Sequence, residues 1–284
     1  STQDRDKSLL RSQLLSTFGD QPVGQIRPAE VRKWESSSEA APRTRAKALW
    51  ILRSVLELAR TDGAFLRNPT ESVKVSTPPT KVGRALSDAE LRQVLAAAED
   101  VDPRLAAIVW TMAMAGLRIG EVLALKRGDV DLAAGMLQVA GSMSRREGLR
   151  RPKTKAGERT IPIPSALVER LRRHRDEGSV TSIEGLFFTA SRGGPVRYDN
   201  WRSRTWARII DRLDFDITPH HLRHTCATRL FREDGWTPAH VAAMLGHADA
   251  RMTLNTYTHL VPEELPRPSS VDTLLTQAPE TVAT

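Results

Sequence analysis

The chain is poor in cysteine and in long apolar runs, and each shortage excludes a class of protein. Cys226 is the only cysteine among 284 residues, so no disulfide can form within the chain and a reducing cytoplasm is the simplest compartment. We expect Cys226 to pack in a helix as a small apolar residue. The sequence has no apolar run close to about eighteen residues and no charged-then-apolar segment at its start, so we expect neither a membrane partner nor a signal peptide.

Acidic side chains are too few to balance the basic ones. Lys and Arg number 42 against 34 Asp and Glu, which gives a net charge of +8 and an isoelectric point of about 10.1. This excess favours a polyanionic partner such as nucleic acid, although proteins that never touch nucleic acid can also be basic. The length of 284 residues suits one large domain or two ordinary ones, and prolines near residue 80 favour two.

The first 75 residues have the spacing of helices. Apolar residues recur at helical intervals over residues 4–18, Pro28 suits the first position of a second helix, and residues 43–61 carry a longer apolar stripe. We therefore predict a helical domain of residues 1–75. Basic side chains outside the last stripe are candidate DNA contacts, although charge on a helix face is often only solvated: Arg43, Arg45 and Lys47.

A polar stretch, residues 76–85, separates this domain from the rest. It carries two prolines and a glycine without periodicity, which is typical of a linker. After it, Ser87 and Glu90 fit a capping box, and Pro103 begins another helix that ends at Gly116. Further helical patterns cover residues 165–176, 199–213, 219–232, 238–245 and 250–258.

Strand patterns interrupt these helices only briefly. Residues 136–139 and 159–163 have the composition of strands, with turns rich in glycine and charge predicted at 141–148 and 155–157. The predicted fold is mainly α with a small antiparallel β-sheet, the second domain being a mixed α/β unit of residues 86–262. Residues 263–284 form a proline-interrupted tail, whose leucines suit docking on a neighbouring protomer.

A block of chemically active side chains ends at Tyr257. His220 and Arg223 lie one helical turn apart, so they share a face of the helix that starts at Thr218. A tyrosine hydroxyl has a pKa of about 10 and is a weak nucleophile. It needs a base to accept its proton and cations around the phosphorus that it attacks. The imidazoles and guanidinium of this block, with His247 in a Leu-Gly-His segment, supply both and indicate attack on a phosphodiester.

An arginine and a glutamate follow the glycine at residue 116. This glycine ends one helix and lets Arg118 begin the next, from which its side chain can project into a cleft. Glu121 lies one helical turn further on, where a carboxylate can orient that arginine. A pair with this spacing is also common on protein surfaces.

The segment of residues 145–159 is strongly basic. It has seven Lys or Arg residues against two glutamates, as suits a hairpin lying in a DNA groove or along its backbone. Lys153 precedes the turn and is a candidate proton donor, with Lys155 as the alternative. The candidate DNA contacts in this segment are Arg145, Arg146, Arg150, Arg151 and Lys155.

These motifs together resemble the active-site set of the tyrosine recombinases, the phage-integrase family. The likeness extends over nearly the whole chain, and its specificity comes from the order and spacing of weak individual motifs. It implies a helical core-binding domain and a mixed α/β catalytic domain around duplex DNA. It also implies DNA recombination or viral genome integration for a phage or mobile element, in a bacterial host's cytoplasm in association with the nucleoid.

The resemblance implies a role for each matching residue. Arg118, Arg223 and His247 would bind the non-bridging oxygens of the scissile phosphate. Tyr257 would attack it, so that the 3′ end of the DNA becomes joined to the tyrosine.

The resemblance assigns the proton transfers and the orienting contacts to the remaining residues of the set. Lys153 would protonate the leaving 5′-oxygen, His220 would accept the phenol proton, and Glu121 would support Arg118 and His220. A 5′-hydroxyl from another strand then attacks the phosphotyrosine, so the resemblance implies neither a cofactor nor a metal.

The resemblance also implies partners. We expect double-stranded DNA, a homo-oligomer that forms a tetramer on paired DNA sites, and accessory DNA-bending or directionality factors. Some family members carry a further N-terminal domain for outlying DNA sites, which is not visible here, and the chain begins without methionine. We expect that an upstream segment is naturally absent or has been removed.

Two other functions are compatible with the same residues. A type IB topoisomerase-like enzyme uses the same phosphotyrosine chemistry but rejoins the same strand, and a catalytically silent DNA-binding protein would keep only the fold.

Two details of the sequence offer alternative chemistry. His220 and His224 are four residues apart on a helix, a spacing that can bind zinc. No glutamate or third ligand is placed as in His-Glu-x-x-His sites, so we expect no metal. The other tyrosine, Tyr198, starts a helix that we expect to lie far from the motif that ends at Tyr257.

Overall fold

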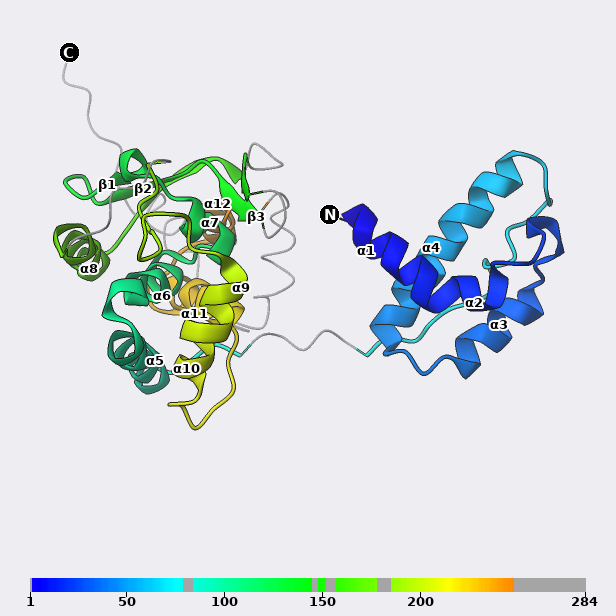
Figure 1. Ribbon diagram of the computed structural model, residues 1–284, viewed down its shortest axis with the longest axis horizontal. Helices are drawn as coiled ribbons and strands as arrows, with labels where there is room; N and C mark the ends of the chain where they lie inside the picture. The colour runs from blue at the N-terminus through cyan, green and yellow to red at the C-terminus, as the bar shows by residue number, and fades with distance from the viewer. Residues whose placement is uncertain (1, 79–83, 145–147, 152–156, 178–184, 248–284) are drawn as a thin grey trace, which may run out of the picture. The chain divides into compact units, whose positions relative to one another are not determined.

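The computed structural model describes residues 2–78, 84–144, 148–151, 157–177 and 185–247 (Figure 1). The chain divides into two compact units, Ser1–Lys81 and Val82–Thr284, and the division falls inside the stretch predicted as a linker. Each unit has its own hydrophobic core. The predicted helix at 250–258 and the predicted tail at 263–284 lie outside the described residues.

The first unit is built from helices. Its core gathers Leu14 and Phe18 from the first helical segment with Trp34 and Leu52 from the later ones, and the Trp34 indole donates to the Gln13 carbonyl at 2.8 Å. A π-helical turn interrupts the first segment. In chain order the elements are α1 (Thr2–Leu9), η1 (Leu10–Leu14), α2 (Leu15–Phe18), η2 (Val23–Gln25), α3 (Pro28–Ser37) and α4 (Pro42–Thr61).

The second unit is organised around one buried helix. Four consecutive residues of α6, from Ala106 to Val109, are buried, because α5, α8 and α11 pack around it (Figure 1). None of the described helices is long and apolar enough to cross a membrane. The helical elements are α5 (Asp88–Val101), α6 (Pro103–Ala115), α7 (Ile119–Ala124), η3 (Arg127–Asp129), α8 (Ser165–Asp176), α9 (Tyr198–Asn200), η5 (Trp201–Trp206), α10 (Ala207–Ile210), α11 (Pro219–Arg232) and α12 (Pro238–Leu245).

Two small antiparallel sheets accompany these helices. The first has the order β1 (Val130–Asp131), β2 (Met136–Val139) and β5 (Arg159–Pro162), with Val139 paired to Arg159. The second pairs β3 (Ser142–Ser144) with β4 (Gly148–Arg150). The fold class predicted from the sequence is confirmed.

One local prediction is partly wrong. Within residues 141–148, where a turn was predicted, residues 142–144 form β3 and Gly148 starts β4, whereas residues 145–147 lie outside the described residues. Gly141 lies close to the opposite strand, since a Cβ atom there would come within 3.3 Å of the Arg150 carbonyl oxygen. Glycine permits this close approach of backbones, which the sequence does not distinguish from a turn.

Several helices begin and end where the capping residues in the sequence predicted. The Ser87 amide donates to Glu90 Oε2 at 2.9 Å and the Glu90 amide donates to Ser87 Oγ at 3.3 Å, as the predicted capping box requires. Gly116 ends α6 with a φ of 64°. Helices α8, α11 and α12 have the predicted bounds, and Cys226 is buried in α11.

His174 is buried in the core of the second unit. Its Nε2 lies 3.3 Å from the Phe187 carbonyl oxygen, and its ring is 5.4 Å from that of Phe187 and 5.0 Å from that of Phe188. Burial lowers the pKa of His174 below its ordinary value of 6.5, and the nearby charge of Arg170 lowers it further. The folded protein therefore favours the neutral ring.

We predict that this histidine makes stability sensitive to mild acid. As the pH falls below 6.5, the unfolded chain binds a proton at His174 that the folded protein resists, so the free energy of unfolding decreases. Urea denaturation at pH 7 and pH 5 should show a smaller decrease for His174→Gln than for the wild-type protein. Equal decreases in both proteins would contradict the assignment.

Candidate active site

Residues distant in sequence line one hollow of the second unit. The hollow has a volume of about 380 Å³. The loop between α6 and α7 contributes Arg118, α11 contributes His220 and Arg223, and α9 and η5 contribute Tyr198 and Arg202. Three residues predicted to act together thus lie around the same space.

Arg118 and Glu121 form the predicted pair at the start of α7. The Arg118 amide donates to Glu121 Oε2 and its Nη1 donates to Oε1, both at 2.9 Å. The arginine side chain is 43% exposed, whereas that of the glutamate is 8% exposed. A buried carboxylate therefore holds a guanidinium that still reaches the surface.

A second arginine, Arg159, binds the same carboxylate from the start of β5. Its Nη2 lies 3.1 Å from Glu121 Oε2, and its Nε donates to the Met244 carbonyl oxygen at 2.6 Å. The sequence assigned Arg159 only to a basic stretch. Strand alternation is the signal that was missed, because Arg159 shares a strand face with buried Ile161.

Glu121 is a charged anchor for several arginines. Burial alone would raise its pKa, but the charges and hydrogen bonds of Arg159 and then Arg118 outweigh burial and lower it. Arg223 Nη1 also lies 3.9 Å from Oε2 of this carboxylate. Glu121 is therefore ionised in the folded protein near neutral pH.

Arg223 joins the ends of two helices. Its Nη1 donates to the Gly116 carbonyl oxygen and its Nη2 to the Leu245 carbonyl oxygen, both at 2.8 Å, and its side chain is 4% exposed. A Cβ atom at Gly116 would lie only 2.7 Å from Leu245 Cδ2. Glycine at residue 116 thus permits both the positive φ and the close packing of these helix ends.

Two histidines flank the guanidiniums. Burial, followed by the charges of Arg223 and Arg118, lowers the pKa of His247 to about 4, although Glu121 acts in the opposite direction. Partial desolvation and the same two arginines lower the pKa of His220, even though that side chain reaches solvent. Both rings are neutral near pH 7, so His220 can accept a proton and His247 can donate a hydrogen bond.

The additional histidines of α11 have local contacts. The Thr218 amide donates to His221 Nδ1 at 2.9 Å, which caps the start of the helix, and His224 is buried. Among the residues that the structure describes, no group of three or more His, Cys, Asp or Glu side chains is placed to hold a metal ion.

Some of the predicted site residues belong to segments outside the described ranges. Within the predicted catalytic set, Lys153 and Tyr257 lie outside the described residues. The same holds for three predicted DNA contacts, Arg145, Arg146 and Lys155.

Tyr198 corrects an expectation about distance. It was expected far from the active-site motif, but it lines the hollow beside Arg118 and His220. Trp201 of η5 is 1% exposed in the core, where η5 contacts α5 and the preceding α9, which carries Tyr198, contacts α7. Proximity in the fold therefore makes Tyr198 a necessary control for any role of a tyrosine.

The predicted DNA contacts among the described residues differ in the exposure and the contacts of their side chains. Arg43 and Arg151 are exposed, and Arg150 is half-buried. Arg45 donates to the Glu35 carbonyl oxygen at 3.2 Å and to that of Ser38 at 3.3 Å, at the end of α3.

Lys47 also has partners within its own unit. Its Nζ is 3.4 Å from Asp6 Oδ1 and 3.8 Å from the centre of the Trp50 ring. Arg45 and Lys47 thus have contacts within the described part of their unit, whereas Arg43 is exposed.

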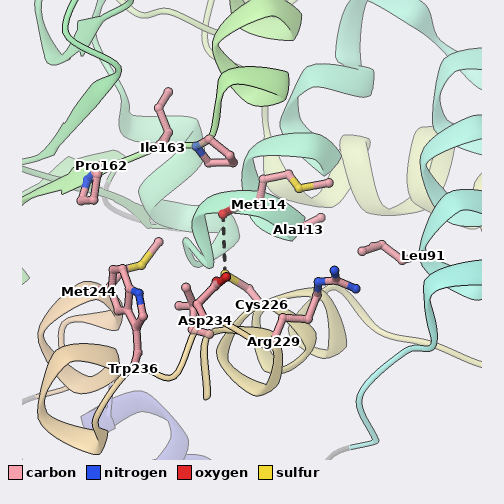
Figure 2. Close-up of a pocket in the computed structure, with 12 residues that line it drawn as sticks. Leu91, Ala113, Met114, Pro162, Ile163, Cys226, Arg229, Asp234, Trp236 and Met244 are labelled. Carbon is pink, nitrogen blue, oxygen red and sulfur yellow. Dashed lines mark hydrogen bonds between the residues drawn. The ribbon is translucent and has the colours of Figure 1, made fainter. Parts of the chain in front are cut away.

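A second hollow of the same unit is mainly apolar. It has a volume of about 450 Å³, and Figure 2 shows Leu91, Ile163 and Trp236 around it. The Cys226 thiol donates to the Met114 carbonyl oxygen at 3.6 Å (Figure 2). Burial raises the pKa of Cys226 to about 12, so this thiol is not a nucleophile at neutral pH. The candidate chemistry therefore belongs to the first hollow.

Known proteins resemble this chain in sequence. Residues 84–264 match the phage integrase family. A XerC-like tyrosine recombinase of Caldanaerobacter subterraneus is 31% identical over 253 residues, covering 78% of this chain and 63% of the relative. The tyrosine recombinase XerD of Ralstonia nicotianae is 30% identical, covering 76% of this chain and 66% of the relative. The chain thus spans slightly less than two thirds of the length of these relatives.

Solved structures share the fold at low sequence identity. The Tn1549 transposon integrase in complex with transposon right end DNA superimposes with a TM-score of 0.78 at 20% identity, covering 97% of this chain and 92% of that one. A lambda integrase tetramer bound to a Holliday junction superimposes with a TM-score of 0.69 at 18% identity, covering 90% of this chain and 71% of that one.

Proposed function

Because the chain belongs to the phage integrase family of tyrosine recombinases, we propose that it is a site-specific DNA recombinase that cuts and rejoins strands through a 3′-phosphotyrosine. The observation that carries the proposal is the convergence of Arg118, His220 and Arg223 on one hollow, with the charge of both arginines acting on His247. Cations and neutral imidazoles around one space suit a reaction that builds negative charge on phosphate oxygens.

The cleavage step transfers the DNA phosphate to a tyrosine. Tyr257 Oη forms a bond to phosphorus as the bond to the 5′-oxygen breaks. His220 takes the phenol proton, and Lys153 gives a proton to the departing 5′-oxygen. The attacked phosphodiester remains a diester, so a 5′-hydroxyl from another strand can reverse the step and complete an exchange.

The phosphate contacts come from side chains whose neighbours hold them in place. Arg118 projects to the surface from its buried partner Glu121, and Arg223 is fixed between two helix ends. His247 would donate from a neutral ring. Preorganised donors of this kind are each worth about a hundredfold or more in rate.

The proposed partners follow from this chemistry and from charge. The excess of basic residues gives a net charge of +8, which suits duplex DNA, with contacts from Arg43, Arg150 and Arg151. Relatives are recombinases, and a lambda integrase forms a tetramer on a Holliday junction, so we propose four protomers on two paired sites. The setting would be the bacterial cytoplasm, on nucleoid DNA, in integration or excision of a phage or mobile element with accessory bending or directionality factors.

Covalent capture tests the proposal and separates the alternatives. The protein is incubated with fragmented DNA of its source, denatured, and the DNA that stays attached is sequenced. A recombinase should retain DNA from a few defined sites and should exchange strands between two of them. Relaxation of supercoiled plasmid without exchange would favour a topoisomerase-like enzyme, and binding without any covalent adduct would favour a silent DNA-binding protein.

Chelation provides an independent prediction. Arg118 and Arg223 supply positive charge where metal-dependent enzymes use a cation, so cleavage should continue in excess EDTA at its original rate. The measurement is the rate of covalent adduct formation with and without chelator, at matched ionic strength. A strict magnesium requirement for cleavage would contradict this account.

A further inference from the structure

We propose that Arg159 is a positioning residue for strand cleavage, which fixes the Glu121 carboxylate and the C-terminal end of α12 together so that Arg118 and His247 face the same phosphate. This inference rests on the proposed recombinase function. In the sequence, Arg159 was only one of the basic residues of the segment 145–159.

Contacts on three sides surround the Arg159 guanidinium. It reaches Glu121 Oε2 at 3.1 Å through Nη2, the Met244 carbonyl oxygen at 2.6 Å through Nε and the Gly157 carbonyl oxygen at 3.2 Å through Nη1. The planar fork of arginine serves several acceptors at once, which a lysine ammonium cannot match with the same geometry. Arg159 therefore connects α7, β5 and α12.

The contact with α12 controls where His247 lies. Arg159 binds the carbonyl of Met244 and Arg223 binds that of Leu245, at the end of the helix where carbonyl groups lack partners within the helix. The helix dipole also favours positive charge at this end. Gly246 then turns the chain in a left-handed conformation, and His247 follows directly. Two arginines thus anchor the helix end that presents the histidine.

The contact with Glu121 controls Arg118. The Glu121 carboxylate binds the Arg118 guanidinium through Oε1 and Arg159 mainly through Oε2, so the two arginines hold it from different sides. Without Arg159 the carboxylate keeps only its bonds to Arg118 and its longer contact with Arg223, so the Arg118 guanidinium is held less firmly. The side chains of Arg159 and Glu121 are both 8% exposed, and Arg159 does not line the hollow of Arg118, His220 and Arg223, so we assign it no phosphate contact. Its effect on cleavage must pass through its neighbours.

A second arginine–glutamate pair of the same unit, with a buried arginine and a half-buried glutamate, offers a control. Arg170 donates to Glu99 at 2.6 Å and 3.1 Å and to the Pro103 carbonyl oxygen, and its side chain is 3% exposed. This arginine does not line the hollow of Arg118 and His220. Variants at Arg170 therefore report the cost of disturbing a buried arginine and its glutamate partner without disturbing the candidate site.

The test measures binding and chemistry separately. Site DNA recovered by covalent capture is used to determine Kd, and single-turnover adduct formation is followed at saturating DNA. Misplaced catalytic groups typically cost on the order of a hundredfold, so Arg159→Ala should bind DNA almost normally but cleave about a hundredfold more slowly. Arg159→Lys should recover only part of that loss. Arg170→Lys should cleave at the wild-type rate once rates are corrected for the folded fraction.

A double-mutant cycle distinguishes positioning from a general loss of stability. Because Arg159 is proposed to act through His247, combining Arg159→Lys with His247→Ala should cost less than the product of the two single effects. The same cycle with Arg170→Lys should be additive in free energy. If Arg159→Ala does not fold, Arg159→Lys and this cycle carry the test.

Three outcomes would overturn the inference while leaving the proposed function intact. The first is a wild-type cleavage rate in Arg159→Lys and also in Arg159→Ala, where the latter folds. The second is that the substitutions at Arg159 and His247 have independent effects on cleavage in the double-mutant cycle. The third is a loss of cleavage rate no greater than that of Arg170→Lys. Failure of the wild-type protein itself to form any covalent adduct would contradict the proposed function, and the inference with it.

Discussion

Replacement of Tyr257 by phenylalanine should abolish covalent attachment to DNA while leaving DNA binding nearly unchanged. The substitution removes only the hydroxyl that would attack phosphorus, and the guanidiniums of Arg118 and Arg223 remain. Loss of a nucleophile typically costs on the order of a millionfold, so no adduct should be visible on denaturing gels. Binding is measured in parallel by mobility shift with the same site DNA.

Tyr198 supplies the matched control for this experiment. The chain has only two tyrosines, and Tyr198 lines the hollow beside Arg118 and His220. Tyr198→Phe should therefore keep covalent adduct formation. If Tyr198→Phe loses the adduct and Tyr257→Phe retains it, the nucleophile has been assigned to the wrong tyrosine.

Replacement of Lys153 by alanine should slow cleavage by on the order of a hundredfold or more, because an alkoxide leaves poorly without a general acid. DNA with sulfur in place of the 5′-bridging oxygen should restore cleavage by this variant. A thiolate is a good leaving group without protonation, since thiols are far more acidic than alcohols. The measurement is the single-turnover rate of each variant on the oxygen and sulfur substrates.

Two further variants control the lysine experiment. Lys155→Ala should cleave the oxygen substrate well, and rescue of this variant by sulfur instead would transfer the proton donor to Lys155. Arg118→Ala should remain impaired on both substrates, because sulfur does not replace a phosphate contact. Arg118 is a better control than Arg223, whose buried guanidinium also holds two helix ends together. Rescue of neither lysine variant would mean that the proton comes from elsewhere.

Elements with local signals could be predicted from the sequence. The capping box of Ser87 and Glu90, proline at the start of α6 and glycine at its end each act within one or two helical turns. The spacing of Arg118 to Glu121 also predicted a contact that the structure contains. Such features depend on neighbouring residues, so the amino-acid pattern is sufficient to find them.

Features that depend on long-range packing were missed. Arg159 meets Glu121 across 38 residues and Met244 across 85 residues of sequence, and no local pattern specifies either partner. Alternation along β5 indicates that Arg159 faces inward, but it does not identify what lies opposite. Tyr198 entered the candidate site for the same reason, through the packing of η5 on the core.

The electrostatics of the site also required the fold. His247 lies in a segment whose sequence says nothing about burial, and its low pKa comes from desolvation and from arginines on three other elements. Likewise, the basic residues Arg45 and Lys47 looked equivalent to Arg43 in sequence, but they bind α3 carbonyls and Asp6 respectively. The net charge of a sequence depends only on the number of charged side chains, whereas the ability of a basic side chain to bind DNA depends on its contacts in the fold.

Mass spectrometry of the covalent adduct identifies which amino acid carries the DNA and through which end. The wild-type adduct is digested with protease and nuclease, and the nucleotide-linked peptide is identified by mass spectrometry. We predict a nucleotide attached through its 3′-phosphate to Tyr257. A 5′-phosphate linkage, or attachment to Tyr198 or to any residue other than Tyr257, would contradict the account.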